Sequence, residues 1–112
     1  MAPCIFCQIA QGELDSDIVQ EDTRAIAFRD VHPQAPTHIL VIPKKHISSL
    51  AEAPREKGDL LGHLLLMAQK IALDQGLDDY RVVINNGAEA GQTVFHLHMH
   101  LLAGRMFTWP PG

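Results

Sequence analysis

Nine residues form the most distinctive pattern in the chain: Val94-Phe95-His96-Leu97-His98-Met99-His100-Leu101-Leu102. Three histidines stand at every second position, with apolar residues between them. Successive side chains of a β-strand point to opposite faces, so a strand would place the three imidazoles on one face. A helix would scatter them, because about 3.6 residues make one turn. The stretch therefore predicts a strand with one histidine face and one core-packing face.

Length and composition indicate one globular domain over residues 1–112. The chain is 46% hydrophobic and 20% charged, with a net charge of −4. A chain of this length can bury one modest core, and the negative charge argues against a broad nucleic-acid-binding surface. The N-terminus does not resemble a signal peptide, and no apolar run is long enough for a membrane span. We therefore expect a cytoplasmic protein with neither nucleic acid nor membrane as a partner.

In the rest of the chain, the predicted strands are grouped together and do not alternate one by one with helices. The patterns predict a short helix over 4–10, a hairpin of strands over 18–21 and 25–29, a strand over 38–43 with both faces covered, a long helix over 54–75 and a strand over 80–84. Strands joined by short loops favour antiparallel pairing. The grouping of strands predicts an α+β fold.

Cys4 and Cys7 form a C-x-x-C pair near the N-terminus. Such a pair is half of a closed Cys₂His₂ zinc site, and His46 and His96 are the candidates to complete it. Two unligated thiols on a short helix are the alternative. A redox pair is disfavoured, because a thioredoxin-like C-x-x-C belongs near a βαβ pattern and only three residues precede Cys4.

The three alternating histidines suit covalent catalysis better than a shared metal. Neighbours on one strand face lie roughly 6.6–6.8 Å apart, too far for three imidazoles to reach one zinc ion. A neutral imidazole is a good nucleophile toward phosphorus, and His98 has a histidine on either side. His100 could act as a general acid toward the leaving group, and His38 could orient the site from another strand.

The loop over residues 85–93 enters the histidine stretch. Gly87 and Gly91 allow backbone N–H groups to approach a ligand, and Asn85, Gln92 and Thr93 add side-chain donors. These features suit a phosphate. A plain connection between strands is the alternative, because Asn-Gly is a common turn signal.

The spacing H-φ-H-φ-H-φ-φ, with φ apolar, resembles the histidine triad (HIT) superfamily. The run D-V-H-P-Q-A-P-T-H-I-L-V-I-P-K-K-H over residues 30–46, G-Q-T-V-F over 91–95 and W-P-P-G over 109–112 are similar to its nucleotide-binding (HINT) branch, and the cysteine pair to the bacterial zinc-binding type. The resemblance implies a five-stranded antiparallel sheet and a homodimer with one continuous ten-stranded sheet. It also implies hydrolysis of purine nucleoside 5′-phosphoramidates to AMP and an amine, through a nucleotidyl-histidine intermediate.

The resemblance also implies roles for individual residues. His98 matches the nucleophile, and His100 the residue that contacts the phosphate and leaving group. His38 and His96 complete the histidine cluster. The implied nucleotide-binding residues, besides His98 and His100, are Asn85, Gln92 and Thr93 at the phosphate, Asp30 at the ribose, and Ile5, Phe6, Ile9, Phe28, Val31 and Leu40 around base and ribose. The implied zinc ligands are Cys4, Cys7, His46 and His96.

One position departs from the pattern, since Thr93 stands where this branch commonly has serine. Thr93 keeps the hydroxyl, so we expect a change in rate rather than in function. Two other functions remain open: hydrolysis of dinucleoside polyphosphates, found in a sister branch, and a non-enzymatic zinc- and nucleotide-binding module. The W-P-P-G ending and the phosphate-loop residues favour phosphoramidate hydrolysis.

Overall fold

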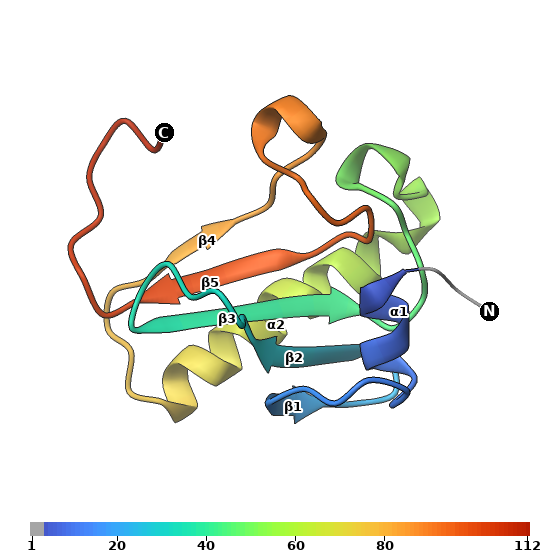
Figure 1. The fold of residues 1–112 in the computed structure, drawn as a ribbon, viewed down its shortest axis with the longest axis horizontal. Helices are drawn as coiled ribbons and strands as arrows, with labels where there is room; N and C mark the ends of the chain where they lie inside the picture. The colour runs from blue at the N-terminus through green and yellow to red at the C-terminus, as the bar shows by residue number, and fades with distance from the viewer. Residues whose placement is uncertain (1–3) are drawn as a thin grey trace.

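The computed structural model describes residues 4–112. Five strands form one antiparallel sheet in the order β1-β2-β3-β5-β4 (Figure 1). The strands are β1 (Ile18–Glu21), β2 (Ala25–Arg29), β3 (Thr37–Pro43), β4 (Arg81–Val83) and β5 (Met99–Ala103); the helices are α1 (Ile5–Ala10) and α2 (Gly58–Asp74), with short 3₁₀ turns at Leu50–Glu52, Arg55–Lys57 and Ala88–Ala90. The predicted α+β class, the hairpin and the helix–strand order are confirmed.

The two helices lie on opposite faces of the sheet (Figure 1). Alternate residues of β2 and β3 divide between the faces, because successive strand side chains point in opposite directions. On one face, α2 packs over Ala25, Ala27, Ile39 and Val41. On the other, α1 packs over a second buried cluster formed by Ile26, Phe28, Leu40 and Ile42. Both faces of β3 are therefore covered, as its continuous apolar run predicted.

The predicted strand over 94–102 is wrong in its first half. Strand β5 begins only at Met99, and residues 94–98 follow an irregular path. This segment is held by bonds outside the sheet ladder, with Leu97 N donating to Ile47 O at 2.6 Å. Phe95 is 51% exposed instead of packing in the core, whereas Leu97, Met99 and Leu101 are buried as expected.

The predicted start of the long helix is also wrong. Pro54 has an extended backbone, with φ −66° and ψ 146°, and a 3₁₀ turn separates it from α2. Helix α2 begins four residues later, at Gly58, and ends at Asp74. Its buried side includes Leu64 and Ile71, but Leu65 is 51% exposed. Within residues 4–112, no helix is long and apolar enough to cross a membrane.

Candidate active site and metal centre

The three histidines of the sequence motif belong to two different clusters. His96 is completely buried and its ring lies against His46, with the centroids 5.0 Å apart. His98 and His100 lie against each other at 5.1 Å, and His100 lies against His38 at the same distance. The irregular path before β5 produces this division, because it frees His96 from the strand face.

The first cluster consists of Cys4, Cys7, His46 and His96. One ligand atom from each lies within 4.8 Å of the others. Cys7 Sγ is 3.2 Å from His46 Nδ1, and Cys4 Sγ is 3.4 Å from His96 Nδ1. Zinc bound at about 2.0–2.3 Å in a tetrahedron needs ligand atoms about 3.3–3.8 Å apart. The cluster therefore has the donor set and the spacing of a closed structural zinc site.

Hydrogen bonds in this cluster leave the ligand atoms free for a metal. His96 Nε2–H donates to Pro43 O at 2.8 Å, so its Nδ1 keeps a lone pair toward the two thiols. Cys4 is the N-cap of α1, and Cys7 N–H donates to Cys4 Sγ at 3.4 Å. Burial, together with the neighbouring Cys4, raises the pKa of Cys7 to about 11. A bound cation would reverse that shift and hold the thiolate.

The second cluster is a chain of hydrogen bonds that fixes the proton positions. Gln34 N–H donates to His38 Nδ1 at 3.0 Å, so the hydrogen of neutral His38 lies on Nε2. That Nε2–H donates to His100 Nδ1 at 2.9 Å. The hydrogen of neutral His100 therefore lies on its own Nε2. This atom is buried and has no hydrogen-bond partner among residues 4–112.

His98 is fixed in the opposite tautomer. Its Nδ1–H donates to the backbone oxygen of His96 at 2.8 Å, which leaves the lone pair on Nε2. The site thus presents an unprotonated nitrogen on His98 beside an unpartnered N–H on His100. A nucleophile and an oxyanion donor are the two groups that transfer of a phosphorus centre requires.

Burial keeps the histidines around His98 neutral. The pKa of His100 is lowered to about 4, first by burial and then by the neighbouring His98 and His38. Burial also lowers the pKa of His38, although Asp30 opposes this shift from 3.5 Å. The pKa of His96 is lowered by burial as well. In neutral solution His100 therefore acts as a neutral hydrogen-bond donor.

Comparison with known proteins agrees with this geometry. Residues 11–107 match the HIT domain. The chain belongs to the HIT family. It is 57% identical over 109 residues to a HIT-like protein of Synechocystis, with 96% of each chain covered. It is 49% identical to the 14 kDa zinc-binding protein of Zea mays, covering 99% of this chain and 89% of the maize protein.

Solved structures of HIT proteins share the whole fold. A HIT family hydrolase from Legionella pneumophila superposes with a TM-score of 0.95 at 50% identity, covering 97% of this chain and 99% of the other. A histidine triad nucleotide-binding protein from Candida albicans gives 0.80 at 37% identity, covering 88% of this chain and 72% of the other. The resemblance predicted from the histidine spacing is thereby confirmed at the level of the HIT family.

Four of the residues expected around base and ribose form the apolar wall beside His98. Phe6, Ile9, Phe28 and Leu40 are buried together in the cluster between α1 and the sheet. The Phe6 ring meets His98 edge to face at 5.1 Å and Phe28 at 5.5 Å. The side chains of Ile5 and Val31 are 46% and 85% exposed, so both are accessible from solvent.

The polar residues expected at the nucleotide fall in different places. Asn85 lines a cavity of about 260 Å³ together with His38 and His100. Thr93 lines another cavity with Cys4 and Ile5, on the side of the metal cluster. The Gln92 amide bonds to Gly87 N, Ser48 O and Val94 O, so this side chain braces the loop and is only 3% exposed.

Two features of the HIT site have no signal in the sequence alone. Gln34 acts through its backbone, with its N–H on His38 and its oxygen accepting from Arg105 Nε at 3.0 Å. Arg81 lines the same cavity as His100 and Asn85, although nothing in the local pattern of β4 marks it. Backbone roles and the approach of distant side chains depend on the fold, and only the structure shows them.

Proposed function

We propose that the protein hydrolyses the phosphorus–nitrogen bond of nucleoside 5′-phosphoramidates, with His98 as the nucleophile. One observation supports this most directly: His98 Nε2 holds a lone pair beside the buried Nε2–H of His100, which has no partner within residues 4–112. A buried donor without a partner is unfavourable by roughly 1–3 kcal/mol, and a phosphate oxygen would satisfy it. The hydrolase named among the similar structures supports the reaction class.

In the first half-reaction, His98 Nε2 bonds to phosphorus as the phosphorus–nitrogen bond breaks, and the electron pair leaves on the amine nitrogen. The hydrogen bond from His98 Nδ1 to the His96 carbonyl stabilises the positive charge that then develops on the imidazole. The departing amine takes one proton. His100 passes this proton to the amine; it gains the proton from solvent as substrate binds, because the negative phosphate beside it favours the protonated imidazole.

In the second half-reaction, water attacks phosphorus and gives one proton to His100. The bond to His98 Nε2 breaks, its electron pair returns to the imidazole, and the nucleoside monophosphate leaves. Until it passes a proton to the amine in the first half-reaction, His100 Nε2–H donates to a phosphate oxygen. Asp30, 3.5 Å from His38, is the proposed acceptor for a ribose hydroxyl. The apolar wall around Phe6 and Phe28 is the proposed surface for a purine base. The likeness to a nucleotide-binding HIT protein supports placing the chain in the HINT branch.

We propose a structural role for zinc, bound by Cys4, Cys7, His46 and His96. When bound, zinc would join α1 to the segment after β3 and to the segment before β5, because its ligands come from these three distant parts of the chain. The name of the maize relative supports the choice of metal. Both cysteines are free thiols, and a reducing cytoplasm would keep them so.

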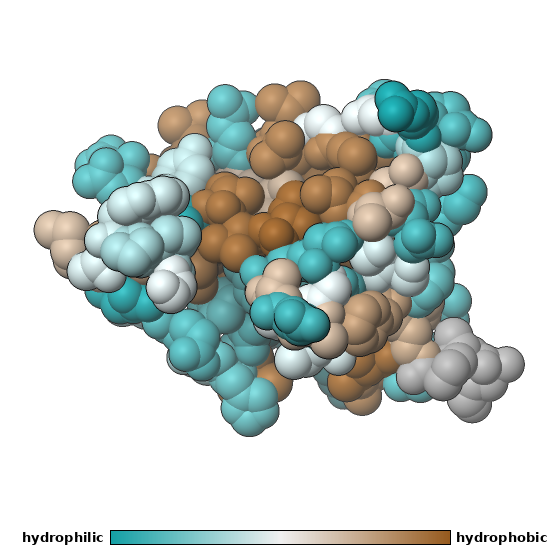
Figure 2. All heavy atoms as spheres, turned by 90° about the horizontal axis from the view of Figure 1, so that it is seen from above, coloured by the Kyte–Doolittle hydropathy of each residue, from teal (hydrophilic) through white to brown (hydrophobic). Residues whose placement is uncertain are grey.

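We further propose a homodimer in which two sheets join along β4. This short strand is at the edge of the sheet, so its outer backbone groups are unpaired within residues 4–112. Figure 2 shows apolar residues gathered on the face seen from above. Exposed apolar side chains on β4, on α2 and on the turn at Leu50–Glu52 are Val82, Leu65, Leu66 and Leu50. Sedimentation should give twice the mass of one chain, and Val82→Asp should give the mass of one.

The test of function compares two substrates side by side. Adenosine 5′-phosphoramidate should release AMP faster than diadenosine tetraphosphate releases any nucleotide, and mass spectrometry of the quenched reaction should locate a nucleotidyl group on His98. Faster cleavage of diadenosine tetraphosphate would assign the protein to the sister activity instead. Absence of both reactions, with AMP still bound, would identify a binding module.

A further inference from the structure

Two arginines without carboxylate partners stand at the end of the active site away from α1. Arg81 NH2 donates to Thr108 O and Arg105 Nε donates to Gln34 O, both at 3.0 Å. Neither guanidinium forms an ion pair among residues 4–112, although other basic side chains in this acidic protein do. Their positive charges are therefore available to an anion.

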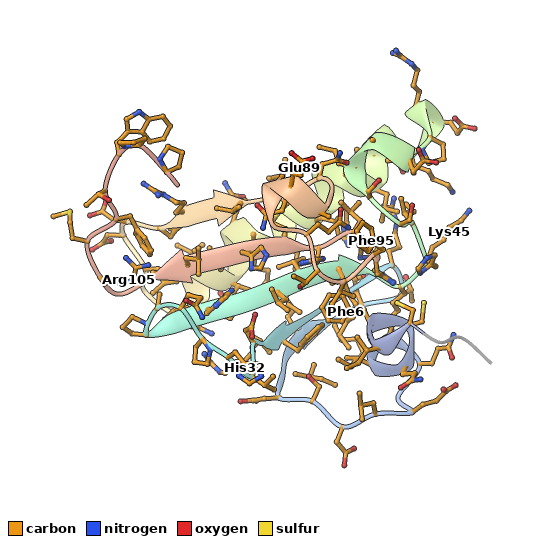
Figure 3. The ribbon with its side chains drawn as sticks, turned by 45° about the horizontal axis from the view of Figure 1, so that its top comes forward. Phe6, His32, Lys45, Glu89, Phe95 and Arg105 are labelled. Atoms are coloured by element: carbon orange, nitrogen blue, oxygen red, sulfur yellow. The ribbon has the colours of Figure 1, made fainter. Side chains whose placement is uncertain are left out.

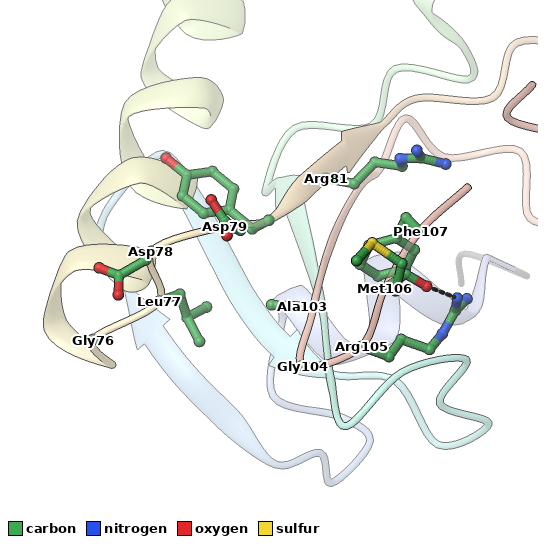
Figure 4. Close-up of a pocket in the computed structure, with 11 residues that line it drawn as sticks. Gly76, Leu77, Asp78, Asp79, Arg81, Ala103, Gly104, Arg105, Met106 and Phe107 are labelled. Carbon is green, nitrogen blue, oxygen red and sulfur yellow. Dashed lines mark hydrogen bonds between the residues drawn. The ribbon is translucent and has the colours of Figure 1, made fainter. Parts of the chain in front are cut away.

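Both arginines are held in place by one aromatic ring. The Arg105 guanidinium lies 4.3 Å from the centroid of Phe107, and that of Arg81 lies 5.2 Å from it. Figure 4 shows the two side chains on either side of Phe107, whereas Asp78 and Asp79 lie by the end of α2. Stacking of this kind limits the rotamers of a guanidinium and prepares it for binding.

The register of the sheet places Arg81 on the face that carries His100. Val83 pairs with His100 and Arg81 pairs with Leu102, so Arg81 is diagonal to His100 on the same face. Arg105 follows the end of β5. There Gly104 turns the chain with a φ of +100° and lies close to Pro36. Figure 3 shows Arg105 at one end of β5 and Phe6 at the other.

Catalytic and cationic groups share one small cavity. His38, His100, Asn85, Arg81 and Arg105 all line the space of about 260 Å³. Pockets for drug-sized ligands measure roughly 300–1,000 Å³, so the occupant is small. An amino acid would fit, and its carboxylate matches the fork of a guanidinium.

We propose that this cavity receives the leaving group, and that Arg81 and Arg105 select amines that carry a carboxylate. The substrate class is then a nucleoside 5′-phosphate joined through phosphorus to the amino nitrogen of an amino acid. This rests on the proposed function, which supplies the amine. The same bonds change as before: the phosphorus–nitrogen bond breaks, and the amino acid leaves after its nitrogen takes one proton.

Two synthetic substrates of nearly equal size test the selection. AMP linked through nitrogen to β-alanine carries a carboxylate, and AMP linked to β-alanine amide does not. The parent protein should show a kcat/KM about tenfold or more higher for the carboxylate, since charge-assisted hydrogen bonds are the stronger ones. In Arg81→Gln and Arg105→Gln this ratio should fall toward one. Arg55→Gln, which removes the same charge outside the cavity, should keep the parent ratio.

Other results separate the two proposals. Equal kcat/KM values for both substrates in the parent, or an unchanged ratio in both glutamine variants, would overturn the carboxylate selection while leaving phosphoramidate hydrolysis intact. If neither compound is hydrolysed and adenosine 5′-phosphoramidate is not hydrolysed either, the proposed function fails. Calorimetry then tests the cavity. If the parent protein binds the carboxylate compound more tightly than the amide, and Arg105→Gln loses this preference, the site is supported. Equal binding of the two compounds by the parent overturns it.

Discussion

The metal cluster (Cys4, Cys7, His46 and His96) and the reactive cluster (His38, His98 and His100) leave opposite ring nitrogens of alternate histidines available. At the metal cluster, Nδ1 of His96 keeps its lone pair and faces two thiols. At the reactive cluster, Nδ1 of His98 carries the hydrogen and Nε2 keeps the lone pair. In both places a backbone carbonyl accepts from the imidazole, and its position decides which nitrogen remains available.

The difference shows that the motif alone does not assign roles. His96 and His98 are two residues apart and both are buried, yet different side chains surround them. Cysteines from the start of the chain surround His96, whereas Phe6 and the β5 residue His100 surround His98. The contacts from distant segments therefore suit His96 to the proposed metal site and His98 to the proposed role of nucleophile.

The largest difference between the clusters should appear when the activity and zinc content of His98→Asn are compared with those of His96→Asn. His98→Asn should lower kcat for adenosine phosphoramidate by about 10⁴-fold or more, as loss of a nucleophile does, and should keep a full complement of zinc. His96→Asn should lose zinc. Steady-state kinetics and metal analysis of the purified variants measure both. Turnover of His98→Asn at the parent rate would rule out covalent catalysis by this residue.

The metal cluster should matter mainly for stability. Cys7→Ser should abolish stoichiometric zinc and lower the free energy of unfolding by several kcal/mol, because zinc binds the folded state alone. Ser49→Ala, which leaves all four ligands in place, is the matched control. Urea unfolding with and without a chelator provides the measurement. An unchanged zinc content in Cys7→Ser would show that the metal is bound elsewhere.

Acid should weaken the fold through the reactive cluster. His100 has a pKa of about 4 in the folded protein against about 6.5 in an unfolded chain. The unfolded state therefore binds more protons between these values, and the free energy of unfolding falls as pH drops from about 6.5 to 4. This shift corresponds to roughly 3 kcal/mol.

His100→Gln isolates that contribution. Both proteins carry the same four candidate metal ligands, so the difference between their unfolding curves reports His100. The variant should show a shallower loss of stability on acidification. Parallel curves for the two proteins would mean that His100 titrates in the folded state near its usual value.

The sequence predicted the features that depend on local patterns and missed those that depend on contacts between distant segments of the chain. The apolar run of β3 and the hairpin of β1 and β2 follow from side-chain alternation, and both were predicted correctly. The strand predicted at residues 94–98 is absent, because the buried position of His96 and the hydrogen bond from Leu97 to Ile47 outweigh the alternation of side chains. The arginines stacked on Phe107 could not be predicted, since residues 24 apart in the chain meet there only after folding.

The smallest expected effect tests whether the two clusters communicate. Phe6 lies edge to face on His98 at 5.1 Å and on His96 at 6.0 Å, and its neighbour Cys7 is a metal ligand. Phe6→Leu removes these contacts, worth about 0.5–1.5 kcal/mol each beyond the buried area. It should slow turnover several-fold, because His98 loses part of its support.

A stability-matched variant separates that positioning from general weakening of the core. Ile26→Val lies in the same buried cluster as Phe6 and should cost about 0.5–1.5 kcal/mol. It has no ring contact with either histidine, so its kcat should stay at the parent value. If Phe6→Leu and Ile26→Val lower stability and kcat alike, Phe6 contributes only packing. If only Phe6→Leu lowers kcat, α1 links the metal cluster to the nucleophile.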